Sequence, residues 1–504
     1  MELDVRLPEL FAGVEVALPP GAERIEVLSL AVDSRKAAPG SLFAALKGAA
    51  ADGAEFAPQA VQRGAVAVLA DRQLEVAPAA LVLARDARRA FSLASSRFHG
   101  EPSKRMRLVG VTGTNGKTTT TYLVEQLAAA TGAHTGLIGT VESRWPGGSA
   151  KATHTTPESH ELQELLAQMA NAGAQLVAME VSSHALAQER VAGCTFAAAA
   201  FTNLTRDHLD YHGTLEAYFE AKARLFRDLL PKGAPAVLNL DDPKCAEIAR
   251  EIGGAIGFTT RGARGAALGA RSIRSDLSGL RFQVRGKFGD AEIESPLVGA
   301  HNAQNLLAAF GLLLALGTPL ADLARVTPQA RGAPGRLERV PDPTGRVVLV
   351  DYAHTDDALA RVLDAVRAAG GKKARVICVF GCGGDRDRGK RPLMGQAAAR
   401  RADLVVATSD NPRTEDPLSI LADIEPGLLK HKRKMGISDA RAGRDGYCII
   451  PDRAQAIELA LRSARAGDAV VIAGKGHEDY QIVGTEKRPF DDRVEARRIL
   501  EAAR

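Results

Sequence analysis

The stretch Gly110-Val-Thr-Gly-Thr-Asn-Gly-Lys-Thr118 places three glycines, three threonines and a lysine between two different kinds of segment. Arg107 to Val111, at its start, is predicted to be a buried strand, and a helical pattern runs from Thr118 to about Ala130 and stops at Gly132. A glycine-rich turn in this setting lets backbone amides approach phosphate oxygens, and the helix N-terminus adds partial positive charge. We therefore predict a nucleotide site, in which Lys117 reaches the terminal phosphates and Thr118 offers its hydroxyl to Mg²⁺.

The spacing of this loop departs from the standard phosphate loop, which would need glycine at position 111, where this chain has Val111. The alternative is a glycine-rich turn that carries a surface lysine. The succession of strand, loop, Lys117 and four threonines at positions 118–121 favours the phosphate loop.

Outward from the loop, short apolar runs alternate with helical patterns, which is typical of α/β domains with a mainly parallel sheet. Pro334-Gly335 marks a boundary, after which the alternation begins again in a Rossmann-like way. A length of 504 residues suggests about three domains. We predict a small N-terminal α/β domain (1–103), a central P-loop ATPase-like domain (104–335) and a C-terminal Rossmann-like domain (336–504).

Composition excludes several classes of function. The net charge of +5 is not concentrated on any segment, so we expect no nucleic-acid partner, and the basic run 430–434 is interpreted as solvated. No run of 18 apolar residues occurs, and Met1 to Arg6 lacks signal-peptide features, so we expect no membrane insertion. The five cysteines are scattered, as in a reducing cytosol. We expect a cytoplasmic enzyme that acts as a monomer.

The loop GxTGTNGKT resembles that of the Mur ligase family, whose superfamily also contains folylpolyglutamate synthetase. Further segments resemble the family's motifs in the same order and together span about residues 30 to 493. They are His154-Thr-Thr-Pro157, Met179-Glu-Val-Ser-Ser-His184, Asn203 to Gly213, Ala221 to Phe226, His301 to Asn305, Pro334-Gly-Arg336, and Asp351-Tyr-Ala-His-Thr355. In the last of these, Asp356 follows where the family usually has proline.

The resemblance implies an ATP-dependent ligase, in which a carboxylate attacks the γ-phosphate and an amine then attacks the acyl phosphate. The implied nucleotide-binding residues are Gly113, Thr114, Asn115, Gly116, Lys117, Thr118, Thr119, Asn302, Arg336, Asp351 and His354. The implied magnesium ligands are Thr118, Glu180, His208 and, if it is carbamylated, Lys222. Lys117, Lys222 and His208 would be the catalytic group.

Two of these residues also have ordinary interpretations. Glu180 ends an apolar run, so it lies at the carboxyl end of a strand, where α/β active sites form, although a strand-end charge in solvent has the same pattern. A lone lysine on a helix, such as Lys222, is normally solvated. In most of the family the matching lysine carries CO₂, which makes it an anion.

The substrate residues also follow from the resemblance. Ser34 matches the uridine-binding segment of the N-terminal domain, and Thr155, Thr156, Ser182, Gln188 and Arg190 match positions that contact a UDP-linked muramoyl dipeptide. The amino-acid site would comprise Arg386, Asp410, Asn411, Arg413, Gly474 and Glu478. Asp410-Asn-Pro-Arg413 is the form found in relatives that add meso-diaminopimelate, and a guanidinium can bind the extra carboxylate of that amino acid through two hydrogen bonds.

The resemblance thus implies amide-bond formation between meso-diaminopimelate and UDP-MurNAc-L-Ala-D-Glu in peptidoglycan synthesis. One alternative is a relative that adds L-lysine to the same precursor. A second is folylpolyglutamate synthetase, which usually has GKGS where this chain has Gly116-Lys-Thr-Thr119. A third, from another class, is a P-loop switch or motor that hydrolyses ATP without ligation.

Overall fold

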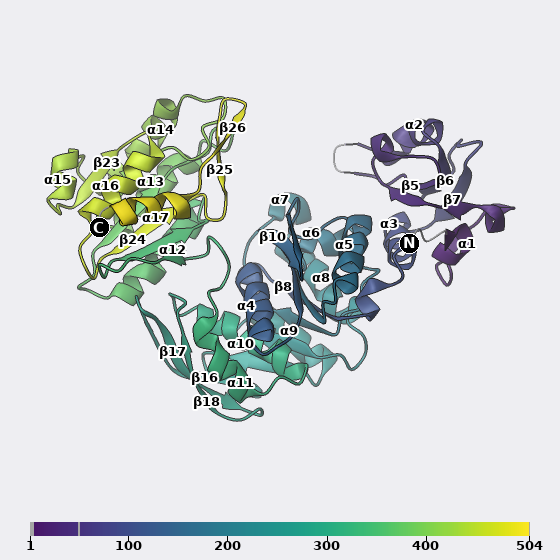
Figure 1. Ribbon diagram of the computed structural model, residues 1–504, viewed down its shortest axis with the longest axis horizontal. Helices are drawn as coiled ribbons and strands as arrows, with labels where there is room; N and C mark the ends of the chain where they lie inside the picture. The colour runs from purple at the N-terminus through teal and green to yellow at the C-terminus, as the bar shows by residue number, and fades with distance from the viewer. Residues whose placement is uncertain (1–4, 49–50, 503–504) are drawn as a thin grey trace. The chain divides into compact units, whose positions relative to one another are not determined.

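The computed structural model describes residues 5–48 and 51–502, so the first residues of the N-terminal stretch considered above lie outside it. The chain forms three large sheets with helices packed on them, an α/β fold in which the central sheet is mainly parallel (Figure 1). None of the helices in the described part of the chain is long and apolar enough to cross a membrane.

The N-terminal sheet has five strands in the order β2-β7-β6-β5-β4, and all pairs except β2–β7 are parallel. The strands are β2 (Val16–Ala17), β4 (Ser29–Ala31), β5 (Ser41–Ala44), β6 (Ala65–Ala70) and β7 (Ala80–Ala84). Helices α1 (Leu7–Leu10), α2 (Ala57–Gln62) and α3 (Ala87–Phe98) contribute to its two apolar clusters.

The central sheet has the order β11-β10-β9-β12-β8-β13-β14-β15-β16-β17-β18. Its parallel strands are β8 (Arg107–Thr112), β9 (Thr135–Ile138), β12 (Leu176–Glu180), β13 (Ala198–Phe201), β14 (Ala236–Asn239), β15 (Ile256–Thr259) and the start of β16 (Leu268–Asp276). Antiparallel strands at the edges are β10 (Glu142–Trp145), β11 (Gly148–Lys151), β17 (Gly279–Gly286) and β18 (Ala291–Ser295). Because β8 lies between β12 and β13, the segments that follow these three strands meet at one edge of the sheet.

The helices of the central region follow the alternation expected from the sequence. They are α4 (Lys117–Ala130), α5 (Ser159–Asn171), α6 (Ser183–Ala187), α7 (Leu209–His212), α8 (Leu215–Arg224), α9 (Pro243–Ile252), α10 (Asn302–Ala315) and α11 (Leu320–Val326). Helix α4 packs on β12 and β9, which fixes its N-terminus above the end of β8.

The C-terminal sheet has the order β19-β20-β24-β21-β22-β23, and only β19 is antiparallel. Its strands are β19 (Glu338–Val340), β20 (Val347–Asp351), β21 (Val376–Phe380), β22 (Leu404–Ala407), β23 (Gly446–Ile449) and β24 (Ala469–Ala473), and a separate hairpin is formed by β25 (Tyr480–Val483) and β26 (Glu486–Pro489). Both faces are covered, one by α12 (Asp356–Gly370), α13 (Lys390–Arg401) and α14 (Pro417–Leu429), the other by α15 (Ile437–Arg441), α16 (Arg453–Ser463) and α17 (Asp492–Ala502). This three-layer arrangement requires strands that are apolar on both sides, as the sequence of β21 is.

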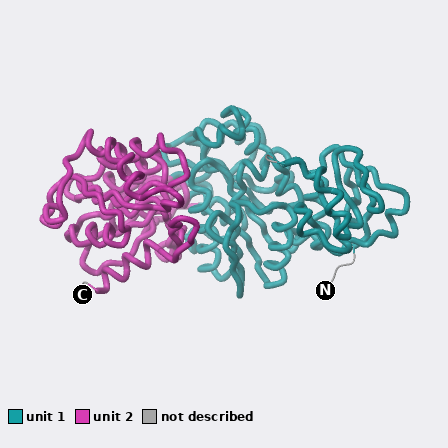
Figure 2. Tube along the Cα trace, turned by 90° about the horizontal axis from the view of Figure 1, so that it is seen from above, with its two compact units in different colours: residues 1–269, 286–288, 307–323 teal, residues 270–285, 289–306, 324–504 magenta. Residues whose placement is uncertain are grey.

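The chain divides into two compact units, residues 1–269 with 286–288 and 307–323, and residues 270–285 with 289–306 and 324–504 (Figure 2). The domain boundaries at residues 103 and 335 remain a prediction. The basic run 430–434 is followed by α15 and then by β23, which pairs with β22.

Candidate functional site

The glycine-rich loop leaves β8 and enters α4 through residues that need unusual backbone angles. Gly116 precedes the helix with φ +86°, and Gly113 has φ +145°. A Cβ atom on Gly113 would lie 1.9 Å from Thr202 Oγ1, so the loop passes too close to the end of β13 for any side chain at this position. Gly113 is therefore favoured by the packing of the loop as well as by the approach of a phosphate, and the positive φ of Gly116 favours glycine there too.

The segment after β13 fixes the loop by hydrogen bonds. Backbone amides of Thr114 and Asn115 donate to the carbonyl and side-chain oxygens of Asn203, at 2.8 and 3.0 Å. Thr202 Oγ1 donates to the Asn115 carbonyl at 2.6 Å, and Thr205 N donates to Thr114 Oγ1 at 3.0 Å. The loop is thus pre-organised, and sequence analysis assigned no such role to Asn203 or Thr205.

Two lysines meet at one carbonyl group of this loop. Lys117 Nζ donates to the carbonyl oxygens of Gly113 at 2.8 Å and Thr114 at 3.0 Å. Lys222, which α8 carries and which is 1% exposed, donates to the same Gly113 oxygen at 2.9 Å. Burial and then the nearby Lys117 charge lower the pKa of Lys222 well below its ordinary value. Lys222 is therefore no solvated surface lysine.

The hydroxyl of Thr118 and the carboxylate of Glu180 come together behind the loop. Thr118 Oγ1 donates to Glu180 Oε2 at 2.9 Å, and the Glu180 side chain is fully buried. Thr140, at the end of β9, donates its backbone amide to Glu180 Oε1 at 2.8 Å and its hydroxyl to Oε2 at 3.2 Å. Sequence analysis missed Thr140, for which the only available signal was its position after an apolar strand.

His208 lies in a group of aromatic rings beside the loop. Its ring is 5.0 Å from that of His184 and 6.1 Å from that of Tyr218, whose hydroxyl donates to Thr114 Oγ1 at 3.3 Å. The residue itself has φ +50° and precedes α7. Burial, then the neighbouring histidines, lower the pKa of His184 to about 4, so that ring is neutral near pH 7. Among the described residues, no group of three or more His, Cys, Asp or Glu side chains is arranged to hold a metal.

The five residues predicted to contact the muramoyl dipeptide form a connected group next to Glu180. Thr156 Oγ1 donates to the Glu180 carbonyl at 2.8 Å and to Ser182 Oγ at 3.3 Å. Arg190 donates to the Thr156 carbonyl at 2.9 Å and to Gln188 Oε1 at 2.7 Å, while Thr155 shares a hydroxyl contact with Thr140 at 3.1 Å.

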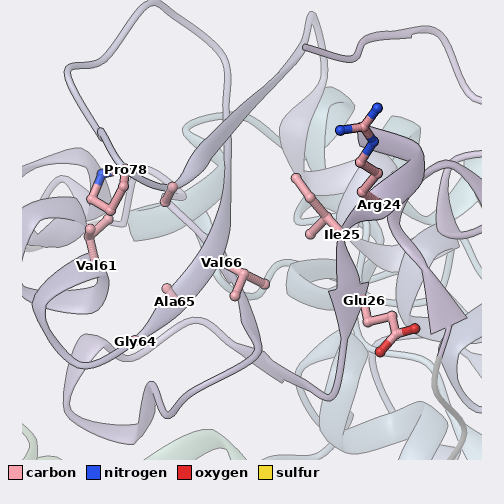
Figure 3. Close-up of a pocket in the computed structure, with 9 residues that line it drawn as sticks. Arg24, Ile25, Glu26, Val61, Gly64, Ala65, Val66 and Pro78 are labelled. Atoms are coloured by element: carbon pink, nitrogen blue, oxygen red, sulfur yellow. The ribbon is translucent and has the colours of Figure 1, made fainter. Parts of the chain in front are cut away.

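Ser34 lies in the N-terminal region, where its buried hydroxyl donates to Gln59 Oε1 at 2.7 Å. That region also contains a cavity of about 480 Å³, and Figure 3 shows Arg24, Glu26 and Pro78 among the side chains around it. Ser34 does not line this cavity, and neither does any other residue predicted to bind substrate. The cavity is therefore not the predicted substrate site.

The second unit holds the other residues predicted to bind the nucleotide. Asp351 ends β20 and accepts hydrogen bonds from the amides of Leu337 and Ala353, at 2.7 and 2.8 Å, and its burial raises its pKa. The Arg336 guanidinium lies 5.2 Å from the centre of the Tyr352 ring, and its buried Nε has no hydrogen-bond partner among the described residues. His354 contacts the Tyr352 carbonyl through Nδ1 at 2.9 Å.

Asn302 is also in the second unit, where it begins α10. Its side-chain amide donates to the Val298 carbonyl and accepts from Asn305, both at 2.9 Å.

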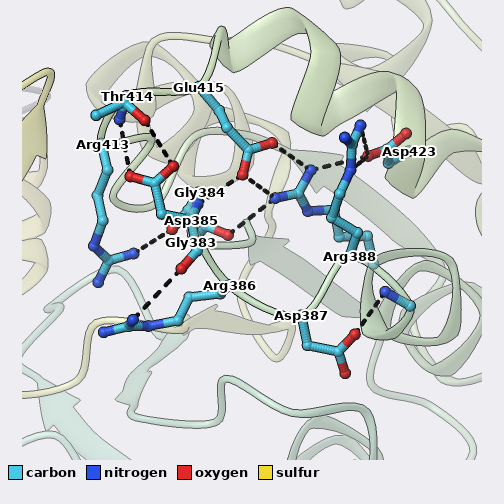
Figure 4. Close-up of polar contacts among 12 residues, drawn as sticks. Gly383, Gly384, Asp385, Arg386, Asp387, Arg388, Arg413, Thr414, Glu415 and Asp423 are labelled. Atoms are coloured by element: carbon cyan, nitrogen blue, oxygen red, sulfur yellow. Dashed lines mark hydrogen bonds and ion pairs between the residues drawn. The ribbon is translucent and has the colours of Figure 1, made fainter.

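Two loops at the carboxyl ends of β21 and β22 carry the residues predicted to bind the amino acid. Arg413 Nη1 donates to the Gly384 carbonyl at 2.7 Å, and the Gly384 amide donates to the Asn411 carbonyl at 2.9 Å. Figure 4 shows Arg386 and Arg413 extending on the same side of the loop that contains Gly383 and Gly384.

A third segment after β24 joins these loops. Asn411 Nδ2 donates to Glu478 Oε2 at 3.0 Å, and the buried Lys475 ammonium lies 3.1 Å from the same oxygen. A Cβ atom on Gly474, which has φ +115°, would lie 2.6 Å from Asp410 Oδ2. All six predicted amino-acid contacts therefore lie on three neighbouring strand-end segments. Lys475 was missed, because a lysine between two glycines has no pattern that predicts burial.

Comparisons with known proteins find matches along nearly the whole chain. Models described as Mur ligase family catalytic domain, Mur ligase middle domain, and Mur ligase glutamate ligase domain match residues 26–97, 111–313 and 335–476. A relative from Parasynechococcus marenigrum (strain WH8102), named UDP-N-acetylmuramoyl-L-alanyl-D-glutamate–2,6-diaminopimelate ligase, is 48% identical over 507 residues, which cover 98% of each chain.

Solved structures agree with these matches. A structure that carries the same ligase name has a TM-score of 0.74 and 36% identity, and the match covers 99% of both chains. The MurF ligase from Thermotoga maritima, solved with ADP, has a TM-score of 0.58 and 16% identity over 94% of this chain and 97% of its own, a likeness that extends to the fold alone.

Proposed function

Because this chain belongs to the Mur ligase family, we propose that it joins meso-diaminopimelate to the D-Glu γ-carboxylate of UDP-MurNAc-L-Ala-D-Glu with cleavage of ATP to ADP and phosphate. The single observation that supports this most is the relative of that name at 48% identity over 98% of both chains. Peptidoglycan precursor synthesis is the role that follows, and we place it in the cytoplasm, where the five free cysteines described would stay reduced.

The phosphate loop would bind and polarise ATP. Asn203 and Thr205 fix the loop between Gly113 and Gly116, and the first backbone amides of α4, which begins after Gly116, would supply donors to the phosphates. Lys117 would leave its internal acceptors and reach the terminal phosphates. Since attack of a carboxylate on the γ-phosphate brings two anions together, positioned donors and positive charge are what this chain must provide.

Thr118 and Glu180 offer oxygen ligands that suit Mg²⁺. The ion is hard and usually keeps several waters, so one hydroxyl, one buried carboxylate and phosphate oxygens form a suitable set. The 2.9 Å hydrogen bond between Thr118 and Glu180 places the hydroxyl and the carboxylate side by side, which supports a shared ligand role. A magnesium ion held there would neutralise the phosphates during transfer, and His208 is the third proposed ligand.

Lys222 is proposed to carry CO₂. Carbamylation consumes the neutral amine, releases one proton and leaves an N-carboxylate. The low pKa of buried Lys222 favours that neutral amine, and the product would be an anion facing the phosphate loop. Intact-mass measurement in bicarbonate should show an added CO₂ on wild type and none on Lys222→Ala, and short carboxylates should restore activity to this variant. Absence of both effects would contradict carbamylation while leaving the ligase proposal intact.

Amino-acid selection is assigned to the C-terminal loops. Arg413 would bind the distal carboxylate of diaminopimelate, and Glu478 with the Gly474 carbonyl would accept from the distal ammonium. Arg386, Asp410 and Asn411 would hold the rest of the amino acid. L-Lysine has no second carboxylate, so Arg413 would gain nothing from it.

The experiment that tests the function is phosphate release from ATP in the presence of UDP-MurNAc-L-Ala-D-Glu and a panel of free amino acids. We expect release only with both co-substrates and fastest with meso-diaminopimelate. Equal rates with L-lysine would favour the lysine-adding relative, and release without any amino acid would contradict ligation. Glutamate-dependent release with a folate in place of the nucleotide precursor would favour folylpolyglutamate synthetase.

A further inference from the structure

Arg391 carries a fully buried guanidinium at the first turn of α13, and it is not among the residues predicted to bind substrate or nucleotide. Its two terminal nitrogens donate to both carboxylate oxygens of Glu415, Nη1 at 2.9 Å and Nη2 at 2.7 Å. Nη1 also donates to Asp423 Oδ2 at 2.9 Å. Paired nitrogens on paired oxygens fix both the distance and the plane of the two groups.

Glu415 passes this constraint to the other loop. Its Oε1 accepts from the Asp385 amide at 2.6 Å, and the Asp385 carboxylate accepts from the hydroxyl and amide of Thr414, at 2.7 and 3.2 Å. Figure 4 shows these contacts as a closed group between the loop that contains Asp385 and the loop that contains Arg413. The two loops are thus joined through Glu415 and Asp385, in addition to the hydrogen bond from Arg413 Nη1 to the Gly384 carbonyl.

The backbone of both loops is held in an unfavourable conformation. Asp385 has φ +53° and Arg413 has φ +52°, and residues other than glycine rarely adopt this backbone region. The Arg413 backbone is also clamped by the β25–β26 hairpin, because its amide donates to the Ile482 carbonyl at 3.0 Å and its carbonyl accepts from Gly484 at 2.7 Å. Such a conformation persists only where the surroundings determine it from several sides.

We propose that Arg391 is a positioning residue for amino-acid selection, which through Glu415 holds the two loops in register so that Arg413 faces the distal carboxylate of the substrate. This inference rests on the proposed function, since it concerns how the same site recognises a diamino dicarboxylic acid. The hydrogen bonds from Arg391, and then from the Asp385 amide, lower the pKa of Glu415 to about 2, so the pair stays ionised at every pH at which the enzyme would work.

The test compares Arg391→Lys with Glu415→Gln and with Arg401→Lys as the matched control. Lysine keeps the charge of Arg391 but cannot bind both oxygens of Glu415. Arg401 lies on the same helix and pairs with Asp364 at 2.9 Å, away from both loops. The measurements are KM and kcat for each of the three substrates, the ratio of kcat/KM for diaminopimelate to that for L-lysine, and the thermal midpoint.

We expect Arg391→Lys and Glu415→Gln to raise KM for diaminopimelate about tenfold or more and to lower the selectivity ratio. KM for ATP and for the UDP-linked dipeptide should stay within about twofold, and Arg401→Lys should match wild type throughout. An unchanged KM for diaminopimelate in a folded variant overturns the inference, as does a parallel rise in all three KM values with a lowered thermal midpoint. If Arg391→Lys does not fold, the KM values and the thermal midpoint of Glu415→Gln test the inference by the same criteria. A wild type that does not use diaminopimelate contradicts the proposed function itself.

Discussion

Lys117 and Lys222 donate to the same carbonyl oxygen, that of Gly113, at 2.8 and 2.9 Å, although they are 105 positions apart in sequence. Two ammonium groups on one acceptor, one of them buried, disfavour the protonated form of Lys222. A protonated Lys222 at this position would lower the stability of the folded protein. The same position suits a lysine that loses its charge or that binds an anion.

Lys222→Met should therefore stabilise the nucleotide-free protein while abolishing ligation. The folded state lowers the pKa of Lys222, so the unfolded chain binds more protons below the ordinary pKa of lysine, and the stability of wild type rises with pH through that window. In CO₂-free buffer we expect the variant to melt a few °C higher near pH 7 and the gap to shrink toward pH 10. Scanning calorimetry between pH 7 and pH 10 measures the difference in melting temperature between the variant and wild type. Lys232→Met, at an exposed lysine, is the control. A lower melting temperature for Lys222→Met than for wild type at pH 7 would contradict the inference that burial of the Lys222 ammonium destabilises the fold.

Gly113→Ala should disable the phosphate loop. Its Cβ atom would lie 1.9 Å from Thr202 Oγ1, so the loop or the end of β13 must shift, at a cost of about 1–3 kcal/mol in unfolding free energy. We expect ATP binding, measured by calorimetry, to weaken at least tenfold. Gly173→Ala is the matched control, because that glycine has φ +82° but open space around it. Normal ATP affinity in Gly113→Ala would show that the loop tolerates displacement.

Glu180→Gln tests the magnesium proposal. Glutamine retains an acceptor for the Thr140 amide but removes the buried negative charge that a divalent cation would face. The magnesium concentration for half-maximal phosphate release should rise at least tenfold, with little change in thermal midpoint. Glu125→Gln, which removes a carboxylate paired with Arg144, should leave the magnesium dependence unchanged. An unaltered magnesium requirement in Glu180→Gln would remove this residue from the metal site.

Arg413→Ala should lose diaminopimelate selectively. Two charge-assisted hydrogen bonds, at about 1.5–3 kcal/mol each, predict a loss of about 100-fold or more in kcat/KM for diaminopimelate and little change for L-lysine. Since Arg413 has φ +52°, Arg413→Asn should be measured as well, because asparagine tolerates this conformation. Arg388→Ala, which removes an exposed partner of Asp423, is the control. Equal losses with both amino acids would indicate a collapsed loop rather than a lost contact.

The sequence by itself determined the alternation of strands and helices and the position of the phosphate loop, because periodicity and glycine spacing depend on near neighbours in the chain. It predicted the limits of β8 and α4 to within one residue. It did not predict the hairpin β25–β26 or strand β23, whose residues are partly polar or lie in a charged stretch.

Only the tertiary structure decided which distant groups meet. The burial of Lys222 against Gly113, the contacts of Thr140 with Glu180 and the pairing of Arg391 with Glu415 all depend on which strands are neighbours in a sheet. A local pattern carries no information on that order, because the same run of apolar residues fits any position between two helical layers.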